Sequence, residues 1–293
     1  MELKVALYRA KSWLRHQLTA WNTGGEGVHS PYLFEWVRMV MMDKNAYYIW
    51  GEIERCREKM LRDERELEFV DYGSGKLKGE NGKLKGANGE RRRVCDIARR
   101  SLAKRKYAQM LSRLVNWLGS PLLTSPSRGG IGDETLEDRK GLTIVELGTS
   151  LGVTTAYMAA MDSRNRVVTF EGCEAVANMA KENWKALNIN NIECRVGEID
   201  VEELVGDIEH LDVAFIDANH TYVSTCEYFD VLAGKVREKS VIVVDDIHYS
   251  EEMEKAWKAI CADERVTSTI DLYQMGLVFF DKHYWKRHYT MRL

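Results

Sequence analysis

The sequence lacks the signatures of several protein classes. Its six cysteines include no Cys-x-x-Cys pair, which argues against a zinc knuckle or a disulfide framework and fits a reducing cytoplasm. No run approaches the roughly 18 uninterrupted apolar residues of a membrane-spanning helix, and early charged residues leave no visible secretory signal. A net charge of −3, from 42 basic and 45 acidic residues, gives no electrostatic case for a dedicated nucleic-acid binder. We therefore expect a cytoplasmic protein without a membrane partner.

What the sequence does contain is enough apolar material for a sizeable core. Hydrophobic residues make up 45% of the 293 positions and include eight Trp, which excludes global disorder. The pattern predicts a helical N-terminal extension over 1–120, with a Gly- and Lys-rich insertion at 73–90. A Ser-, Pro- and Gly-rich linker follows at 121–141, and a domain of alternating strands and helices at 142–293.

Helical periodicity dominates the N-terminal region. Apolar and aromatic residues recur at spacings of three and four between residues 6 and 42, and we expect this amphipathic stretch to pack on the rest of the chain rather than on a membrane surface. The pair Ser30-Pro31 is typical of a helix start, an interpretation we prefer to a pocket lined by His29. A charged helix is predicted over 51–67, and one or two helices over 93–115.

Short apolar runs predict the strands of an α/β fold. Five of them alternate with helical segments, as a parallel sheet requires, at 143–147, 166–171, 192–196, 212–217 and 240–245. Two closing runs, near 267–272 and 276–280, are too close together for a crossover helix, so they should form an antiparallel hairpin.

One turn carries the strongest functional signal. The run Glu146-Leu147-Gly148-Thr149-Ser150-Leu151-Gly152 follows a buried strand and precedes a helix, the arrangement that builds a nucleotide-binding crevice. Glycine suits positions where the backbone takes unusual angles or approaches a ligand closely. The next strand ends in Glu171, which is placed to accept hydrogen bonds from a ribose diol.

These motifs resemble the class I methyltransferases that use S-adenosylmethionine, over roughly residues 106 to 281. The resemblance implies a Rossmann-like, mostly parallel sheet with an antiparallel last strand, in the order 3-2-1-4-5-7-6. A dehydrogenase is an alternative, but its G-x-G-x-x-G fingerprint is absent from this turn. By position, the resemblance implies that these residues contact the cofactor: Glu146, Gly148, Thr149, Ser150, Gly152, Thr154, Glu171, Asp200 and Asp217.

Polar residues also follow the fourth and fifth strands. Asp217 and His220 follow one, and Asp245, Asp246 and His248 follow the other. Carboxylates gathered at adjoining strand ends suit Mg²⁺ or Ca²⁺. The spacing resembles the catechol and caffeoyl-CoA O-methyltransferases, which implies Asp217 and Asp245 as metal ligands. Asp246 replaces an Asn ligand of that branch, and His220 replaces its Lys base.

Two mechanisms stay open on this basis. In both, an acceptor oxygen attacks the sulfonium methyl in line, and either a metal ion or a general base, His220 or His248, keeps the oxygen nucleophilic. The plainer interpretations are a strand-end cap for Asp217 and a helix N-cap for Asp245 and Asp246. The predicted function is O-methylation of a small hydroxylated acceptor, and the apolar N-terminal segment is compatible with a homodimer.

Other features compete with this interpretation. Gly73-Ser74-Gly75 imitates the cofactor turn, but the tandem hydrophilic repeat behind it offers no helix and favours a solvated insertion. The basic clusters 91–93 and 99–100 are the support for an RNA nucleoside methyltransferase, although we expect no nucleic-acid partner. A cofactor-binding module without catalysis is a further alternative.

Overall fold

A computed structural model describes residues 2–20, 24–25, 27–69, 90–120, 141–198, 200, 205–282 and 286–293. The predicted insertion and linker lie outside these residues, apart from positions 90 and 141. The chain forms two compact units: unit 1 (Met1–Met42 with Asp200–Leu293) and unit 2 (Asp43–Ile199). The division predicted from sequence, near residues 120 and 142, stays a prediction.

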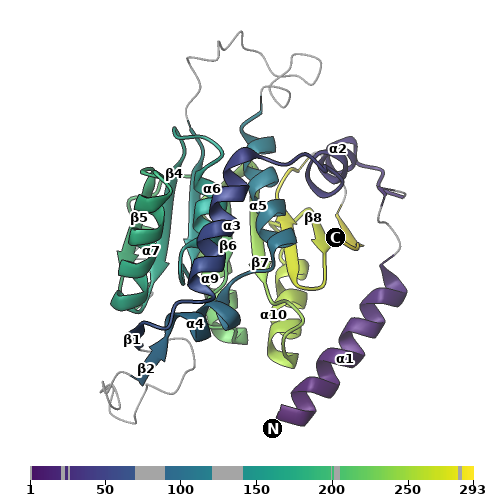
Figure 1. The fold of residues 1–293 in the computed structure, drawn as a ribbon. Coiled ribbons are helices and arrows are strands. Elements are labelled where there is room, and N and C mark those ends of the chain that lie inside the picture. The colour runs from purple at the N-terminus through teal and green to yellow at the C-terminus, as the bar shows by residue number, and fades with distance from the viewer. Residues whose placement is uncertain are drawn as a thin grey trace. The chain divides into compact units, whose positions relative to one another are not determined.

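Unit 2 combines a short parallel sheet with a helical layer. Its elements are α3 (Tyr48–Met60), β1 (Glu66–Phe69), β2 (Glu90–Arg93), α4 (Val94–Ser101), α5 (Arg105–Leu118), β3 (Thr143–Leu147), α6 (Val153–Ala159), β4 (Arg166–Glu171), α7 (Glu174–Ala186) and β5 (Ile192–Val196). The parallel order is β3-β4-β5. Helices α3 and α5 pack on α6, and α7 packs on β4 and β5 (Figure 1).

Unit 1 holds the two ends of the chain. Its elements are α1 (Glu2–Thr19), α2 (Pro31–Trp36), the π-helix η1 (Val37–Met41), β6 (Leu211–Ile216), α9 (Tyr222–Ala233), β7 (Val236–Asp245), α10 (Glu251–Ala262), β8 (Ser268–Asp271), β9 (Met275–Phe279) and β10 (Arg287–Thr290). The order is β10-β8-β9-β7-β6, and β9 runs antiparallel to both neighbours. Helix α9 packs on β6 and β7.

The predicted fold class is confirmed. Each unit contains parallel strands flanked by helices, and β9 is the reversed strand. Within the units the strands follow the expected orders 3-2-1 and 4-5-7-6. The run Val241–Val244 is buried throughout, as expected for a central strand covered on both faces.

Several local expectations need correction. The helix predicted over 51–67 ends at Met60, and residues 66–69 form β1, which pairs antiparallel with β2. Complementary charges across this ladder, such as Glu66 opposite Arg93, favour pairing over continuation of the helix. Strand β10, parallel to β8, has no counterpart in the sequence-based prediction.

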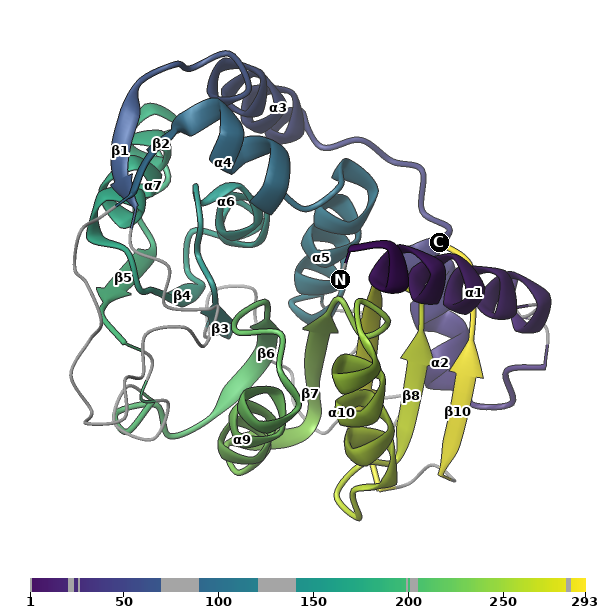
Figure 2. The ribbon, with the colours of Figure 1, turned by 90° about the horizontal axis from the view of Figure 1, so that it is seen from below.

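The N-terminal helices behave differently from one another. Ser30 caps α2 as expected, because its hydroxyl accepts a hydrogen bond from the Leu33 amide at 3.3 Å. Helix α1 lies across the carboxyl ends of β8 and β10 (Figure 2), where the Arg292 guanidinium donates to the Gln17 carbonyl. In the part of the chain that the structure describes, no helix is both long and apolar enough to cross a bilayer.

Candidate active site

The turn between β3 and α6 requires glycine at its end. Gly152 has φ +76°, and a Cβ there would lie 2.5 Å from the indole nitrogen of Trp184. The same nitrogen donates a hydrogen bond to the Gly152 carbonyl at 2.8 Å. The Asn183 amide donates to the adjacent Leu151 carbonyl at 3.0 Å. Both contacts come from α7, so the shape of the turn depends on that helix.

The first half of the turn is anchored to β4. The amides of Gly148 and Thr149 both donate to the Phe170 carbonyl, each at 3.0 Å. Gly148 has φ +98°, which glycine adopts readily. Ser150 has φ +48°, a backbone conformation that is costly for a residue with a side chain. Strain of this kind persists where the surroundings impose it, and it concentrates at ligand-binding sites.

Glu171 stands at the carboxyl end of β4 beside this turn. One carboxylate oxygen accepts a hydrogen bond from the Ser150 amide at 2.8 Å, and the other accepts one from the Cys173 amide at 2.9 Å. Because two backbone donors hold it, the carboxylate has a defined direction. The structure thus brings Glu171 and the glycine turn together.

Glu146 lies beneath the turn and is fully buried. Its carboxylate accepts hydrogen bonds from the hydroxyls of Thr155 and Thr169, the latter at 2.7 Å, and the Thr169 hydroxyl also lies 2.6 Å from that of Thr149. This network ties β3, β4 and α6 together. Thr154, 9% exposed, lies in the first turn of α6.

In unit 1, His220 lies between two of the predicted carboxylates. Its Nε2 is 3.3 Å from Asp217 and 3.6 Å from Asp246. Burial lowers the pKa of His220, but the hydrogen bond and charge of Asp217, together with the charge of Asp246, outweigh burial and raise it. Asp245 is buried at the end of β7. The exposed Asp200 also falls in unit 1.

The backbone around His220 is strained. Positive φ angles occur at Asn219 (+59°), His220 (+22°) and Asp246 (+53°), directly after β6 and β7. The neighbouring helices have other caps: Thr221 caps α9 and Ser250 caps α10. The interpretation of Asp245 and Asp246 as N-caps is therefore wrong, because the Ser250 hydroxyl fills that role.

Asp217, Asp245 and Asp246 are the residues predicted to hold Mg²⁺ or Ca²⁺. Among the described residues, no group of three or more His, Cys, Asp or Glu side chains is arranged to hold a metal ion. Asp217 and Asp246 instead face one imidazole nitrogen, which competes with an ion for their oxygens. The predicted ligands Asp217, Asp245 and Asp246 thus do not fit a metal site here.

His248 belongs to a different cluster in unit 1. Its Nε2 lies 2.8 Å from one Asp271 oxygen, and Nε2 of His16, from α1, lies 3.3 Å from the other. The His248 ring stacks on Tyr273, with centroids 5.4 Å apart. His248 is only 8% exposed. His248 and His16 thus share Asp271, so His248 takes part in the packing of α1 on the rest of unit 1. No sequence pattern indicated this role for His248.

A second contact set holds α1 in place. The Glu254 carboxylate, at the start of α10, accepts hydrogen bonds from the Tyr8 hydroxyl and from the Arg15 guanidinium, the latter at 2.7 Å. Burial raises the pKa of Glu254, but hydrogen bonds from Lys258, Tyr8 and Arg15 outweigh burial and lower it to about 2. Helix α1 is thus latched through its polar residues.

The Asp271 cluster predicts an acid-sensitive contribution to stability. Burial raises the pKa of Asp271, but hydrogen bonds from His16 and His248 outweigh burial and hold it well below its usual range. Such a carboxylate stabilises the fold above its unfolded pKa of about 3.9, and the stabilisation is lost as the pH falls. We expect Asp271→Asn to lower the free energy of unfolding by about 2–4 kcal/mol at neutral pH, measured by urea titration.

The control for this prediction is Glu209→Gln, because the Glu209 side chain is 90% exposed and its pairing with His210 should contribute little. Between neutral pH and about pH 3, wild type should lose more stability than Asp271→Asn. Equal losses in the two proteins would contradict the assignment.

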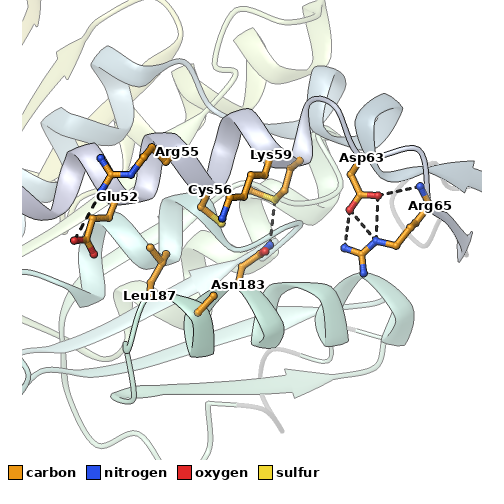
Figure 3. Close-up of a pocket in the computed structure, with 10 residues that line it drawn as sticks. Glu52, Arg55, Cys56, Lys59, Asp63, Arg65, Asn183 and Leu187 are labelled. Atoms are coloured by element: carbon orange, nitrogen blue, oxygen red, sulfur yellow. Dashed lines mark hydrogen bonds and ion pairs between the residues drawn. The ribbon is translucent and has the colours of Figure 1, made fainter.

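Unit 2 also contains a cavity of about 320 Å³ between α3 and α7 (Figure 3). Cys56 and Leu187 line it, and Asn183 contacts Met60 Sδ at 3.1 Å within its wall. Burial raises the pKa of the Cys56 thiol, so this thiol is not activated. The cavity is lined by the opposite end of α7 from Glu171, and it includes none of the predicted site residues.

The basic cluster near β2 is paired with acids. Arg91 lies 3.8 Å from Glu66, and Asp96 lies 2.9 Å from Arg93 and 3.0 Å from Arg99. Carboxylates at this range reduce the net positive charge that a nucleic-acid backbone would meet. This geometry lends the RNA alternative no support.

The similarity of this chain to known proteins covers the glycine turn and Glu171. Residues 145–247 match a family model described as a methyltransferase domain. This range begins in β3, contains the glycine turn and Glu171, and ends just beyond β7. These residues are therefore similar to a methyltransferase domain, and the predicted resemblance to the class I S-adenosylmethionine-dependent enzymes is confirmed.

Particular relatives are O-methyltransferases by name. "O-methyltransferase imqG" of Aspergillus flavus is 32% identical over 111 residues, 35% of this chain and 44% of the relative. The chain thus matches less than half the length of that curated relative. An O-methyltransferase from Bacillus cereus in complex with SAH has the same fold, with TM-score 0.50 and 18% identity over 85% of this chain and 97% of that one. Cofactor-bound Rv0187 from MTB matches with TM-score 0.51 and 14% identity, over 80% and 91% of the two chains.

Proposed function

We propose that this protein transfers a methyl group from S-adenosylmethionine to a hydroxyl of a small acceptor. The observation that carries the proposal is the glycine turn joined to Glu171 by the Ser150 amide, within the segment that matches a methyltransferase domain. The named relatives, which are O-methyltransferases, support oxygen as the accepting atom.

Unit 2 would hold the cofactor. Gly152 lets the turn pack closely against the Trp184 indole, and the oriented Glu171 carboxylate offers acceptor lone pairs to a ribose diol. The hydroxyls around Glu146 keep the turn rigid, since the carboxylate joins two strands and a helix. The cofactor supplies the activated methyl group, so the protein's task is binding and alignment.

Unit 1 would hold and move the proton. His220 accepts the proton of the acceptor hydroxyl, and Asp217 and Asp246 stabilise the imidazolium that forms. This is the metal-free mechanism, which the donor set favours. Tyr249, with its ring centroid 6.0 Å from that of His220 and 42% exposed, offers an aromatic face to an aromatic acceptor such as a phenol.

The cofactor half of the proposal is tested by calorimetric titration of EDTA-treated protein with S-adenosylhomocysteine. We expect micromolar binding by the wild type and a loss of about tenfold to a hundredfold in Glu171→Ala, because a charged hydrogen-bond acceptor is removed. Glu174→Ala, at the exposed start of α7, is the matched control. Wild-type protein that binds no S-adenosylhomocysteine would overturn the proposed function.

A further inference from the structure

Helix α1 buries its polar face and exposes its apolar face, the reverse of an ordinary amphipathic surface helix. The side chains that it buries are small or polar: Ser12 and His16 are each 4% exposed, and they share one face of the helix. Its large apolar side chains point outward: Leu7 is 62% exposed, Leu14 55% and Leu18 77%. Spacings of seven and four place these three leucines on one stripe opposite His16. The apolar face of α1 is therefore left uncovered.

The ion pairs of α1 with the rest of unit 1 keep this apolar face exposed. Arg15 is bound to Glu254, and His16 to Asp271, so turning the helix to bury its leucines would break these contacts with buried or half-buried carboxylates. Trp13, which is 52% exposed, lies about 100° around the helix from Leu14 and forms a separate apolar surface on the flank of the helix. An exposed apolar stripe such as that of the three leucines marks an interaction surface.

The charge of the helix indicates the partner. Residues 7–19 contain Arg9, Lys11 and Arg15 and no Asp or Glu, although the whole chain carries a net charge of −3. Lys11 is exposed and lies between Leu7 and Leu14 in the stripe, whereas the Arg9 guanidinium lies over the Tyr249 ring, 5.2 Å from its centroid. Its aliphatic stem can lie along apolar material while the ammonium reaches a charged head group. A helix with leucines and a lysine on its free face, and no acid among residues 7–19, suits an anionic lipid surface.

A second copy of this chain fits less well. A two-fold contact between the stripes would bring Lys11 of both copies into one apolar interface, and residues 7–19 supply no acid to neutralise them. A bilayer interface instead offers phosphate groups at the level of Trp13 and acyl chains beneath.

We propose that α1 binds the surface of an anionic phospholipid bilayer through the stripe Leu7, Leu14 and Leu18, with Lys11 within the stripe and Trp13 on the flank of the helix. The helix lies in the interface and does not span it. This departs from our expectation that the N-terminal amphipathic segment serves packing alone. The inference does not depend on the proposed methyl transfer.

Cosedimentation with vesicles tests the proposal. Vesicles of phosphatidylcholine containing about one-third phosphatidylglycerol should bind the full-length protein at least about tenfold more tightly than pure phosphatidylcholine vesicles. The double variant Leu14→Ser, Leu18→Ser should lose binding to both compositions, and Lys11→Glu should lose the preference for phosphatidylglycerol. Val223→Ser is the matched control, because Val223 is a 60% exposed apolar residue on α9.

A second readout locates the contact. Brominated phospholipids should quench part of the tryptophan fluorescence of the wild type, and Trp13→Phe should abolish this quenching without preventing sedimentation. Failure to bind phosphatidylglycerol vesicles, or equal binding by the double leucine variant, would overturn the proposal. A wild-type dimer that the leucine variant dissociates, with no vesicle binding, would assign the stripe to a second copy instead.

Discussion

Replacing His220 by alanine is expected to lower the rate of methyl transfer by about 10²- to 10⁴-fold, the usual contribution of a general base. The physical reason is that His220 Nε2 faces both Asp217 and Asp246, at 3.3 and 3.6 Å. These carboxylates favour the protonated imidazole and so make the neutral ring a stronger base. The measurement is turnover of acceptors from a panel of catechols and monophenols, with and without Mg²⁺.

Three comparisons make this prediction specific. His210→Ala is the matched control, since His210 also lies beside a carboxylate, Glu209 at 3.5 Å, but is exposed before β6. Added imidazole should restore part of the lost rate, which a merely structural defect would not allow. Binding of S-adenosylhomocysteine should stay unchanged. A His220→Ala protein that turns over every acceptor at the wild-type rate would favour another base, or a metal-assisted route.

Gly152→Ala is expected to abolish cofactor binding, with an affinity loss of about a hundredfold or more. The added Cβ would lie 2.5 Å from the Trp184 indole nitrogen, and φ +76° is costly for alanine by about 1–2 kcal/mol. Either the turn or the buried indole must move, and either movement changes the shape of the turn that would meet the ligand. Calorimetry with S-adenosylhomocysteine measures the loss, and thermal unfolding shows whether the variant remains folded.

Gly197→Ala separates the effect of backbone strain from the effect of a steric clash. Gly197 has φ +145°, but a Cβ there would meet nothing within 4 Å. This variant therefore carries backbone strain without a steric clash, and we expect it to retain binding within about a few-fold. Pairing Gly152→Ala with Trp184→Phe should recover part of the affinity by making room. If Gly152→Ala binds the ligand normally, the turn does not form the cofactor site.

The sheet was predictable because its strands are apolar runs bounded by turn residues. The predicted limits of β3, β4 and β5 match those observed, and β8 and β9 form the expected antiparallel hairpin. These segments are recognisable locally, since burial on both faces requires a continuous run such as Val241–Val244. The glycine turn is equally local, because its backbone angles exclude most other residues.

The elements that were missed have no such local signal. Strand β10 is short and mostly polar, and it is recognisable as a strand through its pairing with β8. The β1–β2 ladder joins residues on either side of an insertion, so charge pairs such as Glu66 and Arg91 cannot be read from spacing. His16 and His248 meet at Asp271 from positions more than two hundred residues apart along the chain.

The sequence by itself determined the α/β class, the strands and the identity of the glycine turn, because each depends on neighbours within a few residues. Only the tertiary structure decided the roles of charged side chains. It set Asp217 and Asp246 around His220, placed His248 with Asp271, and docked α1 through its polar face. Charged side chains interact with those that lie near them in space. Residues far apart along the chain can meet in the fold, so their separation in the sequence does not predict these pairs.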